Sequence, residues 1–473
     1  MDFSRVLSDD QIARVQAAAE SLLEETGVKI QDGDLLRCCA KAGAKINETS
    51  GIVQWPKTLL RELIARAPAS YTIGGLLGDT WEVGGVRPWS LAIVTDPWII
   101  DYATQQPRRP CLEDLRRHTI IAQQMDPVAA ISRMDFPVTD VEGPASSLRA
   151  LEMHLLYATK HYYFPSASPE SNRQWLDLMR IVADGKDPSA MRLFSVMVAM
   201  ISPLVLSSVN TDLLRLAIEY DAPVVPTICP MAGSTSPYTR ASTLVLGHAE
   251  NLALAALTQL LKPGHPFLYT FGPSVTDLRS GQDLYYTLDK VLWKIASVQL
   301  ARSLNLPVSA ECGGTMTYRY DQQNGMEGFL FMLAAAASGA NLLAGFGSCY
   351  DAVGMSAEMM VIQEAWLQAA QHLRQGIPTD ALRLGLGNLY DAGPGGEFLT
   401  DSLTLEFMHG GEFFSSDLFD YTPAEHTGKS LLERAHERVE ALTENFTSPV
   451  PGAIQEALRR YFHDVCTNIS KHG

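Results

Sequence analysis

Residues 313–321, GGTMTYRYD, bring together side chains that can bind a small charged molecule. Tyr318 and Tyr320 flank Arg319, and tyrosine rings attract quaternary ammonium groups through their electron-rich faces. A guanidinium group can bind a carboxylate through two parallel hydrogen bonds. The segment therefore predicts a site for a molecule with a cationic and an anionic end. The alternative is an ordinary exposed loop that binds nothing.

Further candidates lie at the ends of predicted strands, where the chemistry of an α/β barrel is placed. Asp135, Phe136, Ser166 and Ser168 follow the early strands. The ends of the later strands add Tyr269, Phe271, Glu311, Phe346 and Tyr350, and the start of the predicted helix 322–338 adds Gln322. This aromatic and weakly polar set contains no Lys for a Schiff base and no His for a catalytic triad. We therefore expect it to bind and position a substrate, without a side chain acting as acid or base.

The turn MAGSTSP offers a second way to bind an anion. Gly233, Ser234 and Thr235 follow a predicted strand and precede a long helical pattern, so their backbone N–H groups could bind a negative charge. The alternative is a tight turn in which Ser and Thr only cap the next helix.

Three cysteines also fall at predicted strand ends: Cys229, Cys312 and Cys349. Converging thiolates could bind zinc and activate a thiol substrate, which would make the chain a zinc-dependent thiol methyltransferase. No CxxC pair and no His at ligand spacing supports this alternative, and cysteine is common in protein cores. We therefore expect no metal bound by the protein itself.

Seven short apolar runs, which predict strands, alternate with longer helical patterns. The runs are 128–134, 162–166, 194–200, 223–229, 266–271, 307–312 and 341–347, and the helical patterns are 145–159, 170–184, 208–220, 239–262, 284–304, 322–338 and 355–374. Continuously apolar strands are typical of parallel sheets buried on both faces. The count favours a (β/α)₈ TIM-type barrel, whose eighth strand would be 92–101 or lie after 376. An open doubly wound sheet is the alternative.

Segments outside the barrel are predicted at both ends of the chain. Apolar residues at helical spacing in 8–26 and 59–64 indicate a helical cap over residues 1–90, followed by the barrel over 91–376. Residues 377–473 contain an aromatic stretch, FFSSDLFDY, and a charged helix, KSLLERAHERVEALTENF. We expect this C-terminal extension to pack on the barrel or on a partner.

Composition excludes several classes of protein. The chain has 473 residues, of which 46% are hydrophobic and 19% charged, which is the balance of a folded protein with a large core. A net charge of −16 disfavours nucleic acid as a partner. The N-terminus has no secretory signal, no long apolar run predicts a membrane span, and seven scattered cysteines form no disulfide framework. We therefore expect a cytoplasmic protein that does not bind membranes, and we expect a homo-oligomer.

Longer motifs resemble a known family over nearly the whole chain. The stretches are CPMAGSTSPYTRASTLVLGHAENLALAALTQLLKPGHPFLY, YDQQNGMEGFLFMLAAAASGANLL, MSAEMMVIQEAW, QGIPTD and GPGGEFLTDSLT. They are similar to blocks of the trimethylamine methyltransferase (MttB-like) superfamily, in the same order. Within the first stretch the resemblance includes a Pro-Met-Ala-Gly turn and an acidic-Asn pair in the helix that follows.

The resemblance implies a barrel enzyme that moves a methyl group from an amine to the Co(I) corrinoid of a separate protein, with no tightly bound cofactor of its own. The sequence contains no pyrrolysine, and Glu397 stands where the resemblance leads us to expect His. It therefore resembles the branch that includes glycine betaine:corrinoid methyltransferases. A quaternary ammonium already carries its charge and leaves as a neutral amine, so the enzyme needs mainly to position it. A betaine-binding barrel without catalysis is the remaining alternative.

Overall fold

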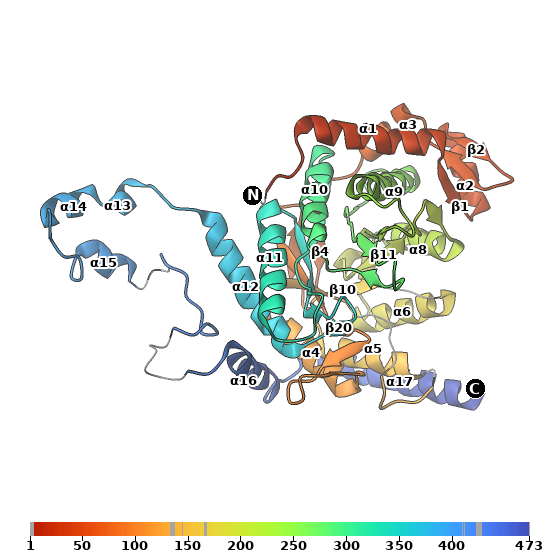
Figure 1. Cartoon of the computed structure of the whole chain (residues 1–473). Coiled ribbons are helices and arrows are strands. Elements are labelled where there is room, and N and C mark those ends of the chain that lie inside the picture. The colour runs from red at the N-terminus through yellow and green to blue at the C-terminus, as the bar shows by residue number, and fades with distance from the viewer. Residues whose placement is uncertain are drawn as a thin grey trace.

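The computed structural model describes residues 4–472, apart from 133–137, 144, 165–167, 409, 411 and 422–427. The candidate residues Asp135, Phe136 and Ser166 lie outside the described residues. Figure 1 shows a compact body that contains the main sheet, with an arm that projects to one side of it.

The centre of the body is a seven-stranded sheet in which every pair of neighbours is parallel. Its order is β13-β11-β10-β9-β6-β18-β17. The strands are β6 (Trp89–Ile93), β9 (Val128–Ser132), β10 (His161–Phe164), β11 (Phe194–Ala199), β13 (Val224–Thr227), β17 (Ser309–Glu311) and β18 (Leu342–Phe346). Six of them fall within the predicted apolar runs or within one residue of them. All five residues of β9 are buried, as its unbroken apolar sequence predicts.

The seventh apolar run lies between the two edge strands of this sheet. Phe267 forms a parallel bridge with Val224 of β13, and Tyr269 forms a second parallel bridge with Val308, the residue before β17. The amide of Leu268 donates to the carbonyl of Val224 at 3.0 Å, and the amide of Ser309 donates to the carbonyl of Tyr269 at 2.9 Å. Residues 266–269 therefore contact both β13 and β17.

The predicted helices are confirmed between these strands: α5 (Ala145–Tyr157), α6 (Pro169–Val182), α8 (Ser208–Glu219), α9 (Arg240–Leu261), α10 (Asp289–Ser303), α11 (Gln322–Ser338) and α12 (Ala357–Gln375). A further long helix, α4 (Leu112–Gln124), precedes β9, and a short one, α7 (Pro188–Met191), precedes β11. Side-chain caps begin several of them, such as Thr239 before α9 and Ser356 before α12. By length and composition α9 could span a membrane, but 83% of its most apolar window is buried in the fold, so it is a core helix.

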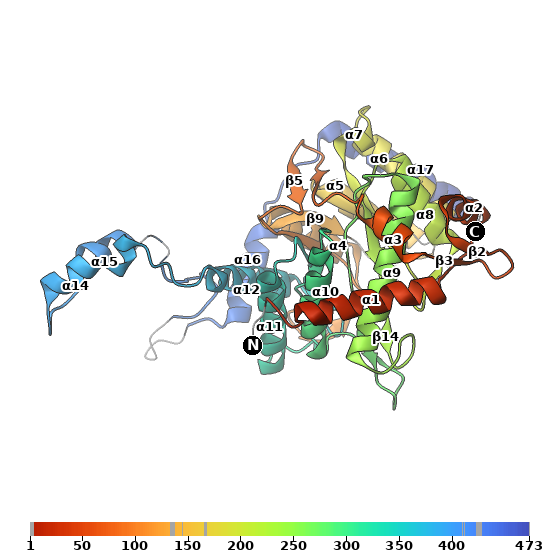
Figure 2. The same cartoon turned by 90° about the horizontal axis from the view of Figure 1, so that it is seen from above.

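The N-terminal part is mixed rather than purely helical. It comprises α1 (Asp9–Glu25), β1 (Val28–Ile30), α2 (Gly33–Ala42), β2 (Lys45–Asn47), β3 (Ile52–Gln54), α3 (Lys57–Ile64), β4 (Tyr71–Gly74) and β5 (Thr80–Val83). The predicted cap omitted these strands of three or four residues, which are too short to show an alternating pattern. Helix α1 lies across α9 (Figure 2), and β1 pairs with β12 (Val205–Leu206) from the body.

Two small sheets lie beyond the C-terminal ends of the main strands. One joins β7 (Trp98–Ile100), β8 (Pro107–Arg108), β19 (Ser348–Cys349) and β20 (Gly354–Met355), and the other joins β14 (Met231–Ala232), β15 (Ser274–Thr276) and β16 (Asp283–Leu284). The segment 92–101, one of two candidates for an eighth strand, includes only the end of β6 and then β7. Because β7 pairs with β20 and β8, this segment is not one strand of the main sheet.

The C-terminal extension has two parts. Helix α16 (Leu431–Thr443) packs against α12 and α4, and α17 (Gly452–His472) packs against α5 and α6. Between α12 and α16, the short helices α13 (Ala381–Leu384), α14 (Leu386–Ala392) and α15 (Ser402–Phe407) form the projecting arm (Figures 1 and 2).

Candidate functional site

A cavity of about 170 Å³ is lined by residues of the main parallel sheet. Each of the seven strands and the segment after Pro266 contributes to its lining. Most of the lining is apolar, with side chains such as Leu91, Met197 and Leu342. Polar groups enter at the C-terminal ends of the strands, where Glu311 is the charged residue of the lining. A small apolar cavity with few polar groups is typical of a site for a small molecule.

Glu311, at the end of β17, is held by groups from the start of α10 and the turn before it. Lys290 Nζ lies 2.9 Å from Glu311 Oε2, and the hydroxyl of Tyr285 donates to Glu311 Oε1 at 2.5 Å. Lys294 Nζ donates to the backbone carbonyl of Glu311. Both lysine side chains are buried, whereas one fifth of the Glu311 side chain stays accessible. Glu311 and Tyr285 are therefore the members of this cluster that line the cavity, whereas the two lysines lie behind them.

The cluster favours an ionised Glu311. Desolvation by itself would raise the pKa of Glu311, but the ammonium groups of Lys290 and Lys294 outweigh it, and the pKa is lowered. Desolvation lowers the pKa of Lys290 and lowers that of Lys294 to about 7. The pKa of Tyr285 is raised well above its ordinary value by burial and by the nearby carboxylate. Tyr285 therefore stays a neutral hydrogen-bond donor.

Tyr285, Lys290 and Lys294 were not among the residues predicted for the site. The two lysines are four residues apart, so they lie on the same face of α10, and that face is buried. Lysine is almost never fully buried unless it is paired. Two lysines at helical spacing inside an otherwise apolar helical pattern were therefore a signal in the sequence that a carboxylate faces them.

The acidic-Asn pair of α9 positions the strand ends. Asn251 Nδ2 donates to the carbonyl of Thr270 at 2.8 Å, and Asn251 Oδ1 accepts from the amide of Thr270 at 3.3 Å. Glu250 accepts from the hydroxyl of Ser202 at 2.8 Å and from the amide of Leu204 at 2.9 Å. Burial raises the pKa of Glu250 to about 7. Both residues act through the backbone and lie outside the cavity.

Phe271, which was predicted as a site residue from the sequence, lines the cavity. Its ring also packs against α9 at Gly247, where a Cβ atom would lie 2.1 Å from Phe271 Cε2. Any larger residue at position 247 would therefore move this ring. Phe271 and Glu311 are the two predicted site residues that the structure brings together in the cavity.

Tyr269 and Phe346 do not line the cavity, although both were placed in the predicted set. Tyr269 is fully buried and its hydroxyl is hydrogen-bonded to His248 of α9 at 2.9 Å, because it points to the opposite face from Leu268. Phe346 is fully buried in the main hydrophobic core. The pairing of β18 with β6 shifts between Ala344 and Phe346, where Gly345 has a φ of +95°. This irregularity interrupts the alternation that would otherwise keep Phe346 on the side of Ala344.

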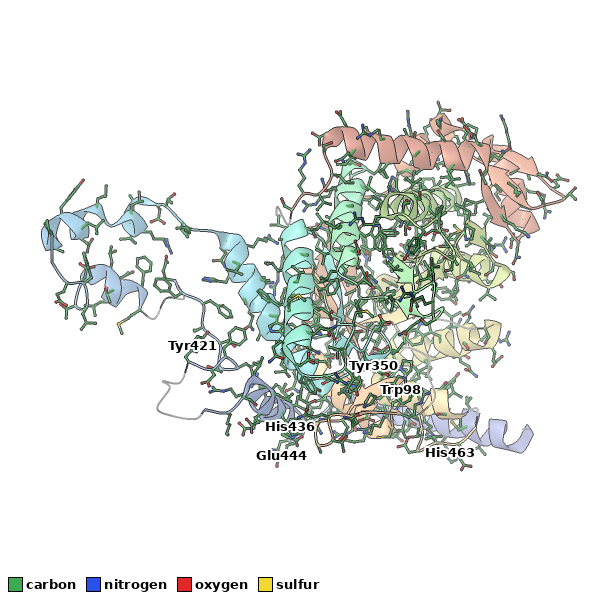
Figure 3. All side chains as sticks on the ribbon, viewed as in Figure 1. Trp98, Tyr350, Tyr421, His436, Glu444 and His463 are labelled. Atoms are coloured by element: carbon green, nitrogen blue, oxygen red, sulfur yellow. The ribbon has the colours of Figure 1, made fainter. Side chains whose placement is uncertain are left out.

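The side chains of the loop 313–321 contact different partners and do not converge on one site. Tyr318 meets Tyr350 edge to face, with ring centroids 5.1 Å apart, and this pair lies on loops outside the cavity lining. The hydroxyl of Tyr320 is instead hydrogen-bonded to that of Ser356 at 2.7 Å. Arg319 and Gln322 are exposed. The segment that follows Tyr350 lies beside Trp98, because β20 pairs with β7 and the amide of Trp98 donates to the carbonyl of Val353 at 3.0 Å; Figure 3 labels both side chains. The predicted single cage of Tyr318, Tyr320 and Arg319 therefore does not form.

The turn at Gly233 does not present free amides to an anion. The amide of Gly233 donates to the carbonyl of Ser236 at 2.9 Å, and those of Ser234 and Thr235 donate to the carbonyl of Met231 at 3.1 and 3.0 Å. Helix α9 begins only at Arg240 and is capped by Thr239. The tight turn of the alternative is therefore present, but the residue that caps α9 is Thr239 rather than Ser234 or Thr235.

The three strand-end cysteines do not form a metal site. Cys312 and Cys349 are buried, and desolvation raises the pKa of both thiols, to about 12 for Cys312. The cavity leaves Cys229 accessible to solvent, but the protein atoms around its thiol raise its pKa to about 12 as well. In the part of the chain that the structure describes, no group of three or more His, Cys, Asp or Glu side chains could hold a metal ion.

A parallel sheet that lines a small apolar cavity, with a charged group at the C-terminal ends of its strands, is typical of α/β proteins that bind small molecules. Within that class, the chain belongs to the trimethylamine methyltransferase (MTTB) family, whose model matches residues 1–466. This is a family of methyltransferases.

Individual relatives agree with this membership. Trimethylamine methyltransferase MttB of Desulfitobacterium hafniense (strain DSM 10664 / DCB-2) is 25% identical over 459 residues, covering 96% of this chain and 92% of the relative. The glycine betaine methyltransferase of Desulfitobacterium hafniense (strain Y51) is 24% identical over 453 residues, covering 94% and 93%. The crystal structure of Methanosarcina barkeri monomethylamine methyltransferase (MtmB) matches with a TM-score of 0.55 at 14% identity, over 93% of this chain and 89% of that chain. The last likeness concerns the fold alone.

Proposed function

We propose that this protein transfers a methyl group from a quaternary amine, glycine betaine or a similar betaine, to the Co(I) corrinoid of a separate protein. The observation that carries the proposal is the small apolar cavity with an ionised Glu311 at its polar end. One of the relatives is a glycine betaine methyltransferase, and the sequence contains no pyrrolysine. Both points favour a quaternary amine over trimethylamine.

The proposal includes a closed (β/α)₈ barrel. Residues 266–269 would be the strand between β13 and β17, and their single bridges to both neighbours support this arrangement. The contribution of every main strand to one cavity supports it too. The strands then follow one another around the barrel in sequence order, starting from β6.

Within the cavity, we assign the ammonium group to the end lined by Phe271, Tyr285 and Glu311. Aromatic faces and a carboxylate both stabilise a cation, and each aromatic contact contributes about 0.5–2 kcal/mol when water is excluded. The cavity of about 170 Å³ suits a small amine and is far too small for a corrin ring. The corrinoid, a co-substrate carried by its own protein, would therefore have to stay at the mouth.

The residues of the chain then act by positioning. Glu311 and the aromatic rings orient one N–CH₃ bond toward the mouth, and the apolar walls exclude water. The Co(I) corrinoid supplies the nucleophile that accepts the methyl group. The amine leaves neutral, so the reaction requires no side chain to donate a proton. This agrees with a Tyr285 whose pKa is raised and a Glu311 whose pKa is lowered.

Neither alternative has comparable support. A zinc-dependent thiol methyltransferase needs converging thiolates, and the raised pKa values of Cys229 and Cys312 disfavour them. A betaine-binding protein without catalysis would use the same cavity. The cytoplasmic location and the division into residues 1–90, 91–376 and 377–473 remain predictions.

The deciding experiment is a screen of glycine betaine, other betaines, choline and trimethylamine with Co(I) cobalamin, in which methylation is followed by absorbance. We expect turnover of a betaine and none of trimethylamine. Efficient trimethylamine turnover would refute the proposed substrate class. Tight betaine binding in calorimetry without methylation of cobalamin or of any corrinoid protein would support the binding protein instead. Stoichiometric zinc in the purified protein would support the thiol enzyme.

A further inference from the structure

The arm, residues 377–421, leaves large apolar side chains uncovered. Helices α13, α14 and α15 have no buried residue. Twelve of the 21 exposed large hydrophobic residues of the described chain lie in the arm: Ile377, Leu382, Leu384, Leu386, Leu389, Tyr390, Phe398, Leu399, Leu405, Met408, Phe413 and Tyr421. Figures 1 and 2 show α14 and α15 well away from the body, and Figure 3 places Tyr421 on the same side.

The arm has a defined shape of its own. Arg383 forms ion pairs with Asp380 at 2.9 Å and with Glu412 at 3.0 Å. Asn388 Nδ2 donates to Asp401 Oδ2 at 2.8 Å, which ties α14 to the start of α15. These polar contacts fix the turns of the arm and leave the twelve apolar side chains exposed, whereas Leu418 and Phe419, at the C-terminal end of the arm, pack against the core of the body.

The apolar area of the arm is that of a protein interface. With about 150–200 Å² for a fully exposed large side chain, the exposed fractions amount to on the order of 1,000 Å². The largest apolar patch on a typical monomer is about 300–600 Å², and a standard interface buries about 800 Å² per partner. The exposed apolar area of the arm is therefore of the size that a partner surface covers in a protein complex.

The charge of the arm limits what that surface can be. Residues 377–421 contain eight carboxylates and one arginine, and no lysine: Asp380, Asp391, Glu397, Asp401, Glu406, Glu412, Asp417, Asp420 and Arg383. Most of the surface of a protein whose net charge is −16 repels an acidic arm. It requires a basic surface with apolar residues among the charges.

One groove on the body has this character. The arginine groove, of about 900 Å³, is lined by Arg87, Arg374 and Arg438 together with apolar residues such as Val86 and Leu367. A neighbouring hollow of about 470 Å³ adds Arg302. None of these four arginines forms a salt bridge within the part of the chain that the structure describes.

Acidic residues weaken the positive charge of the groove only in part. Asp126 and Glu364 are the carboxylic residues of its lining. Burial raises the pKa of Glu364, and the positive charges of Arg438 and Lys160 oppose this shift in part. Val86 is 97% exposed and adds apolar surface at the rim.

The position of the groove separates it from the amine site. Pro88 and Pro127, which line it, precede β6 and β9, so the groove lies at the N-terminal ends of the main strands. The cavity with Glu311 opens at the opposite ends. A second copy of this chain that docks in the groove would therefore leave the access to the cavity open.

We propose that the arm of one protomer docks in the arginine groove of a second copy, so that the protein is an oligomer held by exchanged arms. A protomer cannot fill its own groove in the observed conformation. Gln375, which lines the groove, ends α12, and the arm leads away from the body from that point (Figure 1). This inference does not depend on the proposed methyl transfer.

The test measures molar mass by light scattering after size exclusion, for the full-length chain at micromolar concentration. We expect an oligomer for wild type. An arm variant, Leu386→Ser/Leu389→Ser/Tyr390→Ser, and a groove variant, Arg374→Glu/Arg438→Glu, should each be monomeric. Mixing the two should restore a heterodimer, because one intact arm then meets one intact groove. Leu278→Ser/Arg279→Glu, on an exposed loop beyond the C-terminal strand ends, is the matched control and should keep the wild-type mass.

Hydrogen exchange provides an independent measurement if a variant misfolds. In wild type, amides of α14 and α15 should be protected at high protein concentration and lose protection on dilution. A monomeric wild type at tens of micromolar would overturn the proposal. So would an oligomer that both variants preserve, or two monomeric variants that fail to associate when mixed.

Discussion

Lys290 Nζ lies 2.9 Å from Oε2 of Glu311, and the lysine side chain is fully buried while Glu311 lines the cavity. The pair joins α10 to the end of β17, so a helix of the outer layer fixes the charge at the site. Removing either partner would leave a desolvated charge without its counter-ion, which is costly in a protein interior. The pair therefore links the stability of the fold to the electrostatics of the cavity.

Glu311→Gln should weaken binding of the quaternary amine. The carboxamide keeps the shape but loses the negative charge beside the ammonium, so we expect KM to rise at least about tenfold, equivalent to about 1.4 kcal/mol. Initial rates with glycine betaine and Co(I) cobalamin measure this. Tyr285→Phe keeps the charge and removes one hydrogen bond, and it should raise KM less. Glu397→Gln, on the exposed arm, is the control and should match wild type. A wild-type KM in Glu311→Gln would remove Glu311 from the substrate site.

Lys294→Met should stabilise the protein most at low pH. Desolvation lowers the pKa of Lys294 to about 7 in the folded state, against an ordinary value of 10.5. Between these values the unfolded chain binds more protons, so the contribution of Lys294 to stability rises with pH and is least favourable below pH 7. The advantage of the variant should therefore shrink from pH 6 to pH 9 in urea unfolding. A difference that stays constant over this range would show that Lys294 does not titrate as inferred.

Glu250→Gln should stabilise the protein most at high pH, which is the reverse of the pH dependence expected for Lys294→Met. Burial raises the pKa of Glu250 from 4.5 to about 7, so the folded state binds more protons between those values. Wild type should then lose up to about 3 kcal/mol relative to the variant as pH rises from 4.5 to 8. Thermal and urea unfolding at several pH values measure the difference. Glu219→Gln, on the surface of α8, should follow the wild-type curve, and parallel curves for Glu250→Gln and wild type would contradict the prediction.

Phe346 and Phe271 should respond differently to substitution. Phe346 is fully buried outside the cavity, so Phe346→Ala should cost about 3–5 kcal/mol of stability and leave KM near wild type in the folded fraction. Phe271 lines the cavity, so Phe271→Leu should raise KM about 2- to 30-fold with a smaller loss of stability. Melting temperature and KM together distinguish the two. A stable Phe346→Ala with a strongly raised KM would show that Phe346, after all, contacts the substrate.

The sequence by itself determined the elements and the family. Unbroken apolar runs such as 128–134 and helical patterns such as 239–262 depend on neighbouring residues in the chain, so they predicted β9 and α9 within a few residues. The motifs around Gly233 and Glu250 indicated the family, and in the structure both residues form hydrogen bonds with backbone groups and do not line the cavity.

Only the tertiary structure decided which side chains meet in the cavity. Tyr269 points to the helices because the bridges of its segment to β13 and β17 fix the face of each residue, and Phe346 follows a shift in pairing that its sequence does not reveal. Lys290 and Lys294 reach Glu311 because α10 packs behind β17. A strand presents opposite faces at successive residues, so one bulge or one step in register exchanges the residues inside and outside, and this depends on neighbouring strands that are distant in the chain.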